Sequence, residues 1–367
     1  MTLRQPLMLV GLLACASPVI AQDVKVGGTV EFNYTYNGNK PAGQVNGATG
    51  APYYFNGKSS AFSLNYGEIH VYSDATKERP SGFSFRLVDG AVVAGLPLRT
   101  PGVNTNTALF YEAYGRGVYE LGGKSLTVDA GIFPTHVGYE TINVGGNSFL
   151  SKTFHFGQLQ PFYHAGLRAA LPIDASTTFT GLVFNRYNGV DTNGNTTPGV
   201  GFQVARTLGS ASSVYLNGAF AKDTVGGGER QKNILNVVYN RTLSGTTSIA
   251  ADISAVSGKK AGDANYTAQA VSLYAFLGLG GGDKLALRGE YLTENSAGGQ
   301  LLPSSVGTTK PNLSSITASY ELGKLARPGS RTWLEFRFDS ANTAVFPTAT
   351  GAKKNGSTIS FVQTYSF

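Results

Sequence analysis

Apolar and charged side chains alternate along several segments of this chain, and this pattern limits its fold more than any other feature. In an extended strand, successive side chains point to opposite faces, so residues two apart share a face. Segment 331–339 has an apolar face of Leu334, Phe336 and Phe338 and a charged face of Glu335, Arg337 and Asp339. Segment 284–291 repeats the arrangement. A strand between lipid and water needs two such faces, whereas a packed protein core excludes the charged one.

Alternating segments recur along the whole chain, each about as long as a tilted membrane strand. Short turns rich in Gly, Ser and Asp alternate with long polar loops between them. We therefore predict an all-β fold, a transmembrane antiparallel β-barrel of about 16 strands. The predicted strands are 24–36, 61–73, 81–89, 107–121, 125–134, 162–171, 177–187, 199–207, 212–221, 231–241, 246–256, 266–277, 284–293, 314–322, 331–340 and 357–367.

The composition excludes spanning helices and nucleic-acid binding. Beyond the N-terminal segment, no apolar stretch approaches the roughly 18 residues that a spanning helix needs. The 29 basic and 22 acidic residues give a net charge of +7, and the basic residues are scattered along the chain. Nucleic-acid binding would gather them into a stripe or patch. The alternative fold is a soluble sandwich or barrel, but its core would not accept one charged face in strand after strand.

Residues 1–21 have the pattern of a removed secretory signal peptide. Arg4 precedes a short apolar run, and Val19-Ile20-Ala21 forms a small-residue cleavage site. In an alternative interpretation, Leu12 to Cys15 is a lipobox, and Cys15 is acylated and becomes the mature N-terminus. We expect cleavage after Ala21, which leaves 22–367 as a single barrel domain without cysteine.

The third long connection, residues 135–161, is richer in aromatic residues than a solvated loop tip should be. Such a loop needs a surface on which to pack, and the inner wall of a wide barrel provides one. We expect it to fold into the lumen and narrow the pore. The alternative is a β-hairpin or short helix that lies across the mouth of the barrel.

The chain contains Gly138-Tyr-Glu140, then Asn147 and Ser151, and then Pro-Phe-Tyr-His-Ala-Gly-Leu-Arg at 161–168. In these residues it resembles the OmpL-like family of β-barrel porins. The first strand, 26–36, also resembles that of the family. Two departures are Lys152, where we expect Arg, and 185–189, which lacks an expected Asn-Gly-Trp.

The resemblance implies an outer-membrane channel for small hydrophilic solutes in a Gram-negative-type bacterium. It implies no catalytic residue, cofactor or metal. Passage would be passive, through a water-filled lumen, and a channel selective for sugars or anions is the alternative. The expected partners are outer-membrane lipid, the barrel assembly machinery and the solutes, and a homotrimer stays open.

A charged constriction attracts ions without holding them, so charged side chains of the lumen wall and of the third loop are its candidates. Strand parity places seven acids in the lumen, Glu68, Glu112, Asp129, Asp252, Glu290, Glu321 and Glu335, which nearly balance the basic residues and predict at most a weak anion preference. The candidate constriction residues are Tyr139, Glu140, Lys152 and His155 in the loop and Arg86, Arg116, Arg168, Arg288 and Arg337 on the wall.

The last predicted strand carries Phe361, Tyr365 and Phe367 on one face. This ending resembles the C-terminal aromatic signal that outer-membrane barrels present to their assembly machinery. We expect the strand to close the sheet, because every backbone group in a bilayer needs a partner.

An enzyme is the main competing class, since some barrels hydrolyse substrates. Ser148 or Ser151 with His155 and Glu140 could be drawn as a triad, but closeness in sequence is weak support for triad geometry. An envelope-anchoring or adhesive barrel would need larger domains or a periplasmic coil, for which 22–367 has no segment. We therefore expect a non-enzymatic channel.

Overall fold

The computed structural model describes residues 24–42, 58–94, 109–190, 197–225, 228–259, 265–295 and 312–367. The predicted signal peptide 1–21 and the alternative site at Cys15 lie outside these residues. Within the described part of the chain, no helix is long and apolar enough to cross a membrane.

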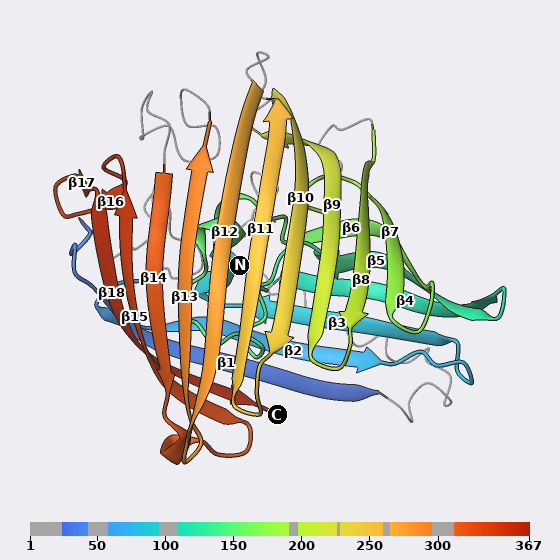
Figure 1. Ribbon diagram of the computed structural model, residues 1–367, viewed down its shortest axis with the longest axis horizontal. Coiled ribbons are helices and arrows are strands. Elements are labelled where there is room, and N and C mark those ends of the chain that lie inside the picture. The colour runs from blue at the N-terminus through green and yellow to red at the C-terminus, as the bar shows by residue number, and fades with distance from the viewer. Residues whose placement is uncertain are drawn as a thin grey trace, which may run out of the picture.

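Sixteen antiparallel strands form a closed barrel, as the alternation predicts (Figure 1). Every predicted strand is present, and its bounds shift by a few residues. The barrel strands are β1 Lys25–Asn37, β2 Ala61–Ser73, β3 Ser81–Asp89, β4 Leu109–Leu121, β5 Lys124–Pro134, β6 Tyr163–Pro172, β7 Thr177–Phe184, β8 Gly199–Leu208, β9 Ser212–Val225, β10 Gly228–Thr242, β11 Thr247–Lys259, β12 Asn265–Gly280, β13 Asp283–Glu294, β14 Asn312–Glu321, β15 Ser330–Ala341 and β18 Asn355–Ser366.

The two faces of the strands follow the predicted parity. On β15, the side chain of Phe336 is 49% exposed on the outer surface, while its neighbour Arg337 is 1% exposed inside. Leu287 and Tyr291 of β13 likewise face outwards, and Arg288 faces inwards. The outer face is therefore apolar, as contact with lipid requires, and the ionisable side chains are turned into the barrel.

Two loop regions differ from the sequence prediction. The connection between the predicted strands 212–221 and 231–241 was expected to contain a long loop at 224–230. Instead, β9 and β10 pair as far as Val225 and Gly228, because their backbone ladder continues through the polar residues 222–224 and 229–231. The last connection, 342–356, was predicted to be a long polar extracellular loop, yet it contains a small hairpin of β16, Phe346–Pro347, and β17, Ala352–Lys353. Phe346 is fully buried and packs 6.2 Å from Phe154, measured between ring centroids.

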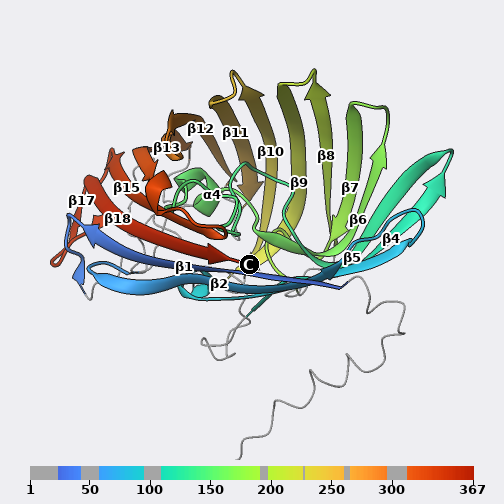
Figure 2. The same ribbon diagram turned by 90° about the horizontal axis from the view of Figure 1, so that it is seen from below.

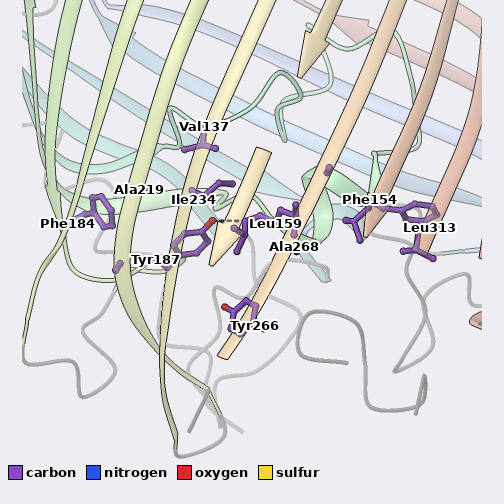
Figure 3. Packing of buried hydrophobic residues seen from close by; sticks show 14 of the residues in the cluster. Val137, Phe154, Leu159, Phe184, Tyr187, Ala219, Ile234, Tyr266, Ala268 and Leu313 are labelled. Carbon is purple, nitrogen blue, oxygen red and sulfur yellow. Dashed lines mark hydrogen bonds between the residues drawn. The ribbon is translucent and has the colours of Figure 1, made fainter. Parts of the chain in front are cut away.

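The inside of the barrel is largely filled. The third loop crosses it and includes the short helix α4, Phe154–Gln158, which lies within the ring of strands (Figure 2). Towards the long-loop end, an apolar cluster joins this loop to the wall (Figure 3). In this cluster, the Tyr187 hydroxyl donates a hydrogen bond of 2.6 Å to the Leu159 carbonyl. Two shorter helices, α3 Ala91–Ala94 and the 3-10 helix η3 Gly323–Leu325, lie in other connections.

The seam between β1 and β18 closes the barrel. Its register runs from Thr29 opposite Ser366 to Asn37 opposite Thr358, and Phe367 and Gly28 exchange two backbone hydrogen bonds beyond that ladder. Phe361 and Tyr365 share one face of β18, as predicted, and this face points outwards. Phe367 therefore adds the last pair of bonds to the closing seam.

Deleting Phe367 should lower the yield of inserted barrel and leave periplasmic aggregate, because the closing strand loses both its terminal bonds and an outward aromatic ring. Heat-modifiable migration on gels measures the folded fraction. Deleting Gln22, which precedes β1 in the sequence, is the control. An unchanged yield without Phe367 would remove the proposed role of this residue in assembly.

Candidate pore and its inner loop

Residues 135–161, here called the inner loop, are held to the barrel wall by carboxylates that accept backbone hydrogen bonds. Glu335 of β15 accepts from the N–H groups of Leu150 and Ser151, at 2.7 and 3.0 Å. Glu290 of β13 accepts from Phe154 N–H at 2.7 Å, at the start of α4. Charge-assisted bonds of this kind are about twice as strong as neutral ones.

A third acid, Asp252 of β11, holds the beginning of the inner loop. It accepts hydrogen bonds from Tyr139 N–H and from the side chain of Gln160, both at 2.9 Å. Gly138, just before, has a φ of +92°, a backbone conformation that residues with a Cβ rarely adopt. A glycine at 138 is therefore required for this approach to the wall.

Glu140 and Arg288 form the buried centre of the inner loop. Their ion pair is 2.7 Å long, and Arg288 also donates to the carbonyl and hydroxyl oxygens of Ser151. Burial opposes ionisation of Glu140, but the guanidinium of Arg288 and the Thr153 N–H lower its pKa below the usual value. The Glu140 carboxylate is therefore charged, and both of its oxygens accept hydrogen bonds from within the protein.

Three more of the predicted constriction residues are also buried between loop and wall. Arg337 pairs with Glu290 at 3.1 Å and with Asp339 at 2.7 Å. Lys152 lies 5.8 Å from the ring centre of Phe156. The third is His155, which contacts wall serines. The structure thus places Glu140, Lys152, His155, Arg288 and Arg337 together, at the contact between loop and wall.

The structure does not assemble the candidate catalytic triad of Ser148 or Ser151 with His155 and Glu140. His155 Nε2 instead lies 2.6 Å from Ser254 Oγ, and its Nδ1 lies 3.8 Å from Asp252. That set also has a serine, a histidine and an acid, but the three side chains are buried, and none lines any of the cavities described below. A substrate has no route to them through those cavities.

The remaining wall arginines differ in exposure. Arg86 bridges two acids of neighbouring strands, Glu68 at 2.6 Å and Glu112 at 3.0 Å. Arg116 and Arg168 flank Asp129, each with a contact of 2.6 Å, in direct cross-strand register on β4, β5 and β6. The Arg116 side chain is 32% exposed and that of Asp129 only 3%, so water has much more access to the cation than to the acid.

A second set of the same kind lies on β13, β14 and β15. Lys284 and Arg331 flank Glu321 at 3.3 and 2.8 Å, and the Lys284 side chain is 62% exposed while Glu321 is 9% exposed. The prediction of a constriction omitted both cations. Their parity would have identified them, because each shares its face with a wall arginine of the same strand.

Open space borders the inner loop towards the short-turn end. Tyr139 lines cavities of 550, 500, 370 and 230 Å³. The 550 Å³ cavity contacts Arg116 and Arg168, and the 500 Å³ cavity contacts Lys284 and Arg331. Among the predicted constriction residues, the structure therefore brings Tyr139, Glu140, Arg116 and Arg168 to a cavity surface.

The sequence pattern of one protein family, described as "Putative beta-barrel porin-2, OmpL-like", matches residues 23–367. No curated protein matches the chain. Solved structures provide further comparisons at the level of the fold.

An anion-selective porin from Comamonas acidovorans has a TM-score of 0.62 and 11% identity, over 94% of this chain and 99% of that chain. The outer membrane channel DcaP of Acinetobacter baumannii has a TM-score of 0.60 and 11% identity, over 94% and 97%. In-vitro folded OmpT of Vibrio cholerae, in its trimer form, has a TM-score of 0.59 and 10% identity, over 94% and 99%. At these identities the likeness shows a shared fold.

Proposed function

The chain belongs to the OmpL-like family of β-barrel porins and is a bacterial outer-membrane porin, and from this premise we propose what its lumen passes. Small hydrophilic solutes and ions cross passively, and the inner loop limits their size. The observation that supports the size limit is the attachment of this loop to β11, β13 and β15 across the inside of the barrel.

The remaining features of the porin are proposals of the same kind. Residues 1–21 are removed on export, and 22–367 form a single barrel domain. The family and fold are those of a non-enzymatic channel, and we propose that the porin catalyses no reaction and needs no cofactor. Outer-membrane lipid and the assembly machinery contact its outer face and closing strand.

We further propose that three barrels associate, as in the trimer form of the similar Vibrio structure. The apolar outer face can contact either lipid or another barrel. Native mass spectrometry of the detergent-solubilised protein distinguishes a trimer from a monomer.

The lumen prefers anions, because its acids and bases differ in access to water. Glu335, Glu290 and Asp252 are occupied by backbone N–H groups of the inner loop. Two groups of charged wall residues, here called the wall sets, line the cavities: Arg116 and Arg168 with Asp129, and Lys284 and Arg331 with Glu321. Each wall set combines two cations with one shielded carboxylate, so its charge is +2 − 1 = +1. Exposed charges of one sign in a confined lumen raise the local concentration of the opposite ion.

The double substitution Arg116→Gln and Lys284→Gln should abolish this anion preference. Each wall set then carries +1 − 1 = 0, and Asp129 and Glu321 keep one partner each, Arg168 and Arg331. The reversal potential in a KCl gradient should move from the anion side to near zero or beyond. Lys77→Gln removes an exposed lysine that lines none of the four cavities and should change nothing. A cation-selective wild type would contradict the proposal.

A further inference from the structure

Four aromatic rings gather where the inner loop meets β12. Tyr139 and Phe149 come from the loop, and Tyr274 and Phe276 come from the lumen face of the strand. The ring centres of Tyr139 and Tyr274 are 4.5 Å apart, and the rings of Tyr274 and Phe276 are parallel to within 6°. Together these rings form one wall of the 230 Å³ cavity.

The rings are not sealed within a core. Tyr139 and Phe276 are partly exposed, and both also line the 500 and 370 Å³ cavities at the short-turn end. The 230 Å³ cavity is well above the roughly 10–15 Å³ that one water needs. A dissolved molecule can therefore reach these rings from the short-turn side.

The polar groups of the cavity point to a ligand with hydroxyl groups. The Tyr274 side chain is 3% exposed, and its hydroxyl has no hydrogen-bond partner among the described residues. A buried hydroxyl without a partner loses stability that a bound polar group can restore. Ser148, Asn147 and Thr141 line the same cavity and place further polar groups beside the rings.

We propose that this cavity, formed by Tyr139, Phe149, Tyr274 and Phe276, is a binding subsite for the ring of a pyranose sugar. A pyranose has an apolar face of C–H groups that packs on aromatic rings, and hydroxyl groups at its edge that pair with polar neighbours. A purely aromatic solute would leave the Tyr274 hydroxyl without a partner. An open-chain polyol has the hydroxyl groups but presents no flat ring face.

This inference rests on the proposed function, because the sugar reaches the cavity only through a water-filled lumen. It adds a preferred solute class to a passive channel. Binding at this site is expected to be weak. The site adjoins the 500 and 370 Å³ cavities at Tyr139 and Phe276, so a bound sugar stays in contact with water and can dissociate.

The test is the ion current through single channels titrated with glucose, and with sorbitol as the open-chain control of similar size. Glucose should reduce the current at lower concentrations than sorbitol does. Tyr139→Ala should raise the half-blocking glucose concentration about fivefold to tenfold. Tyr274→Phe keeps the ring and removes the hydroxyl, and should raise it roughly twofold to tenfold.

Tyr215→Ala is the matched control, since Tyr215 lines the 550 Å³ cavity but not the 230 Å³ cavity. Equal block by sorbitol, or an equal loss of block in Tyr215→Ala, would overturn the sugar site. Normal ion conductance without glucose block would overturn the subsite and leave the porin function intact. Calorimetric titration of the detergent-solubilised barrel with glucose tests binding independently of conductance, and the absence of binding heat there would also overturn the subsite.

Discussion

Replacing residues 143–153 of the inner loop by a short glycine linker is expected to raise the single-channel conductance severalfold and to admit larger sugars. The removed segment contains Leu150 and Ser151, which bind Glu335, and the Lys152 carbonyl, which accepts from Arg337. Without this segment, the charged wall side chains that the loop covers would face water in a wider lumen. A constriction limits flux most where it is narrowest, so removing it has the largest effect that one deletion can produce.

Planar-bilayer recordings measure the conductance, and swelling of liposomes in sugars of increasing size measures the new size limit. The control replaces Ala349 and Thr350 by glycine, at the exposed tip of the β16–β17 connection. Heat-modifiable migration must show that both variants are folded barrels. Unchanged conductance in the folded deletion variant would place the narrowest point of the pore elsewhere.

Phe336→Arg should lower the free energy of unfolding by roughly 2–4 kcal/mol, the cost of a charged side chain on the lipid face near the bilayer midplane. Phe336 lies in the middle of β15, opposite Ala318 and Ile359 of the adjacent strands, and faces outwards. Denaturant titration of the barrel in lipid vesicles measures the loss.

Phe336→Leu is the control for lost ring area and should cost much less. Arg116→Gln, on the lumen side of β4, should leave the free energy of unfolding nearly unchanged, because Asp129 retains Arg168. If Phe336→Arg were as stable as the wild type, the outer face of β15 would not be in contact with lipid.

The barrel could be predicted from sequence because lipid and water impose a period of two on every strand. Each predicted strand is present, and the charged faces of β13 and β15 lie inside as parity requires. Arg116 and Asp129 lie directly opposite each other on neighbouring strands, and the alternation of each strand alone places both side chains in the lumen. The charged pairs of the wall could therefore be predicted from sequence.

The contacts of the inner loop could not be predicted in the same way. Parity places Arg288 and Arg337 inside but cannot show that Glu140 or the Lys152 carbonyl covers them, since these partners are 148 or more positions away in the chain. The burial of Phe346 is a similar case: it depends on Phe154, which a different loop carries. Long-range contacts of irregular segments depend on the shapes of the two surfaces and on the hydrogen-bond partners available. Neither produces a periodic pattern in the sequence, as a strand does.

The most direct test of the account is the current through the purified full-length protein in a planar lipid bilayer. A water-filled lumen narrowed by the inner loop predicts discrete, long-lived conductance steps that are proportional to voltage and salt concentration, with a reversal potential on the anion side. A folded, heat-modifiable barrel that inserts into the bilayer and passes no ions would contradict the central claim that this chain forms an open diffusion channel.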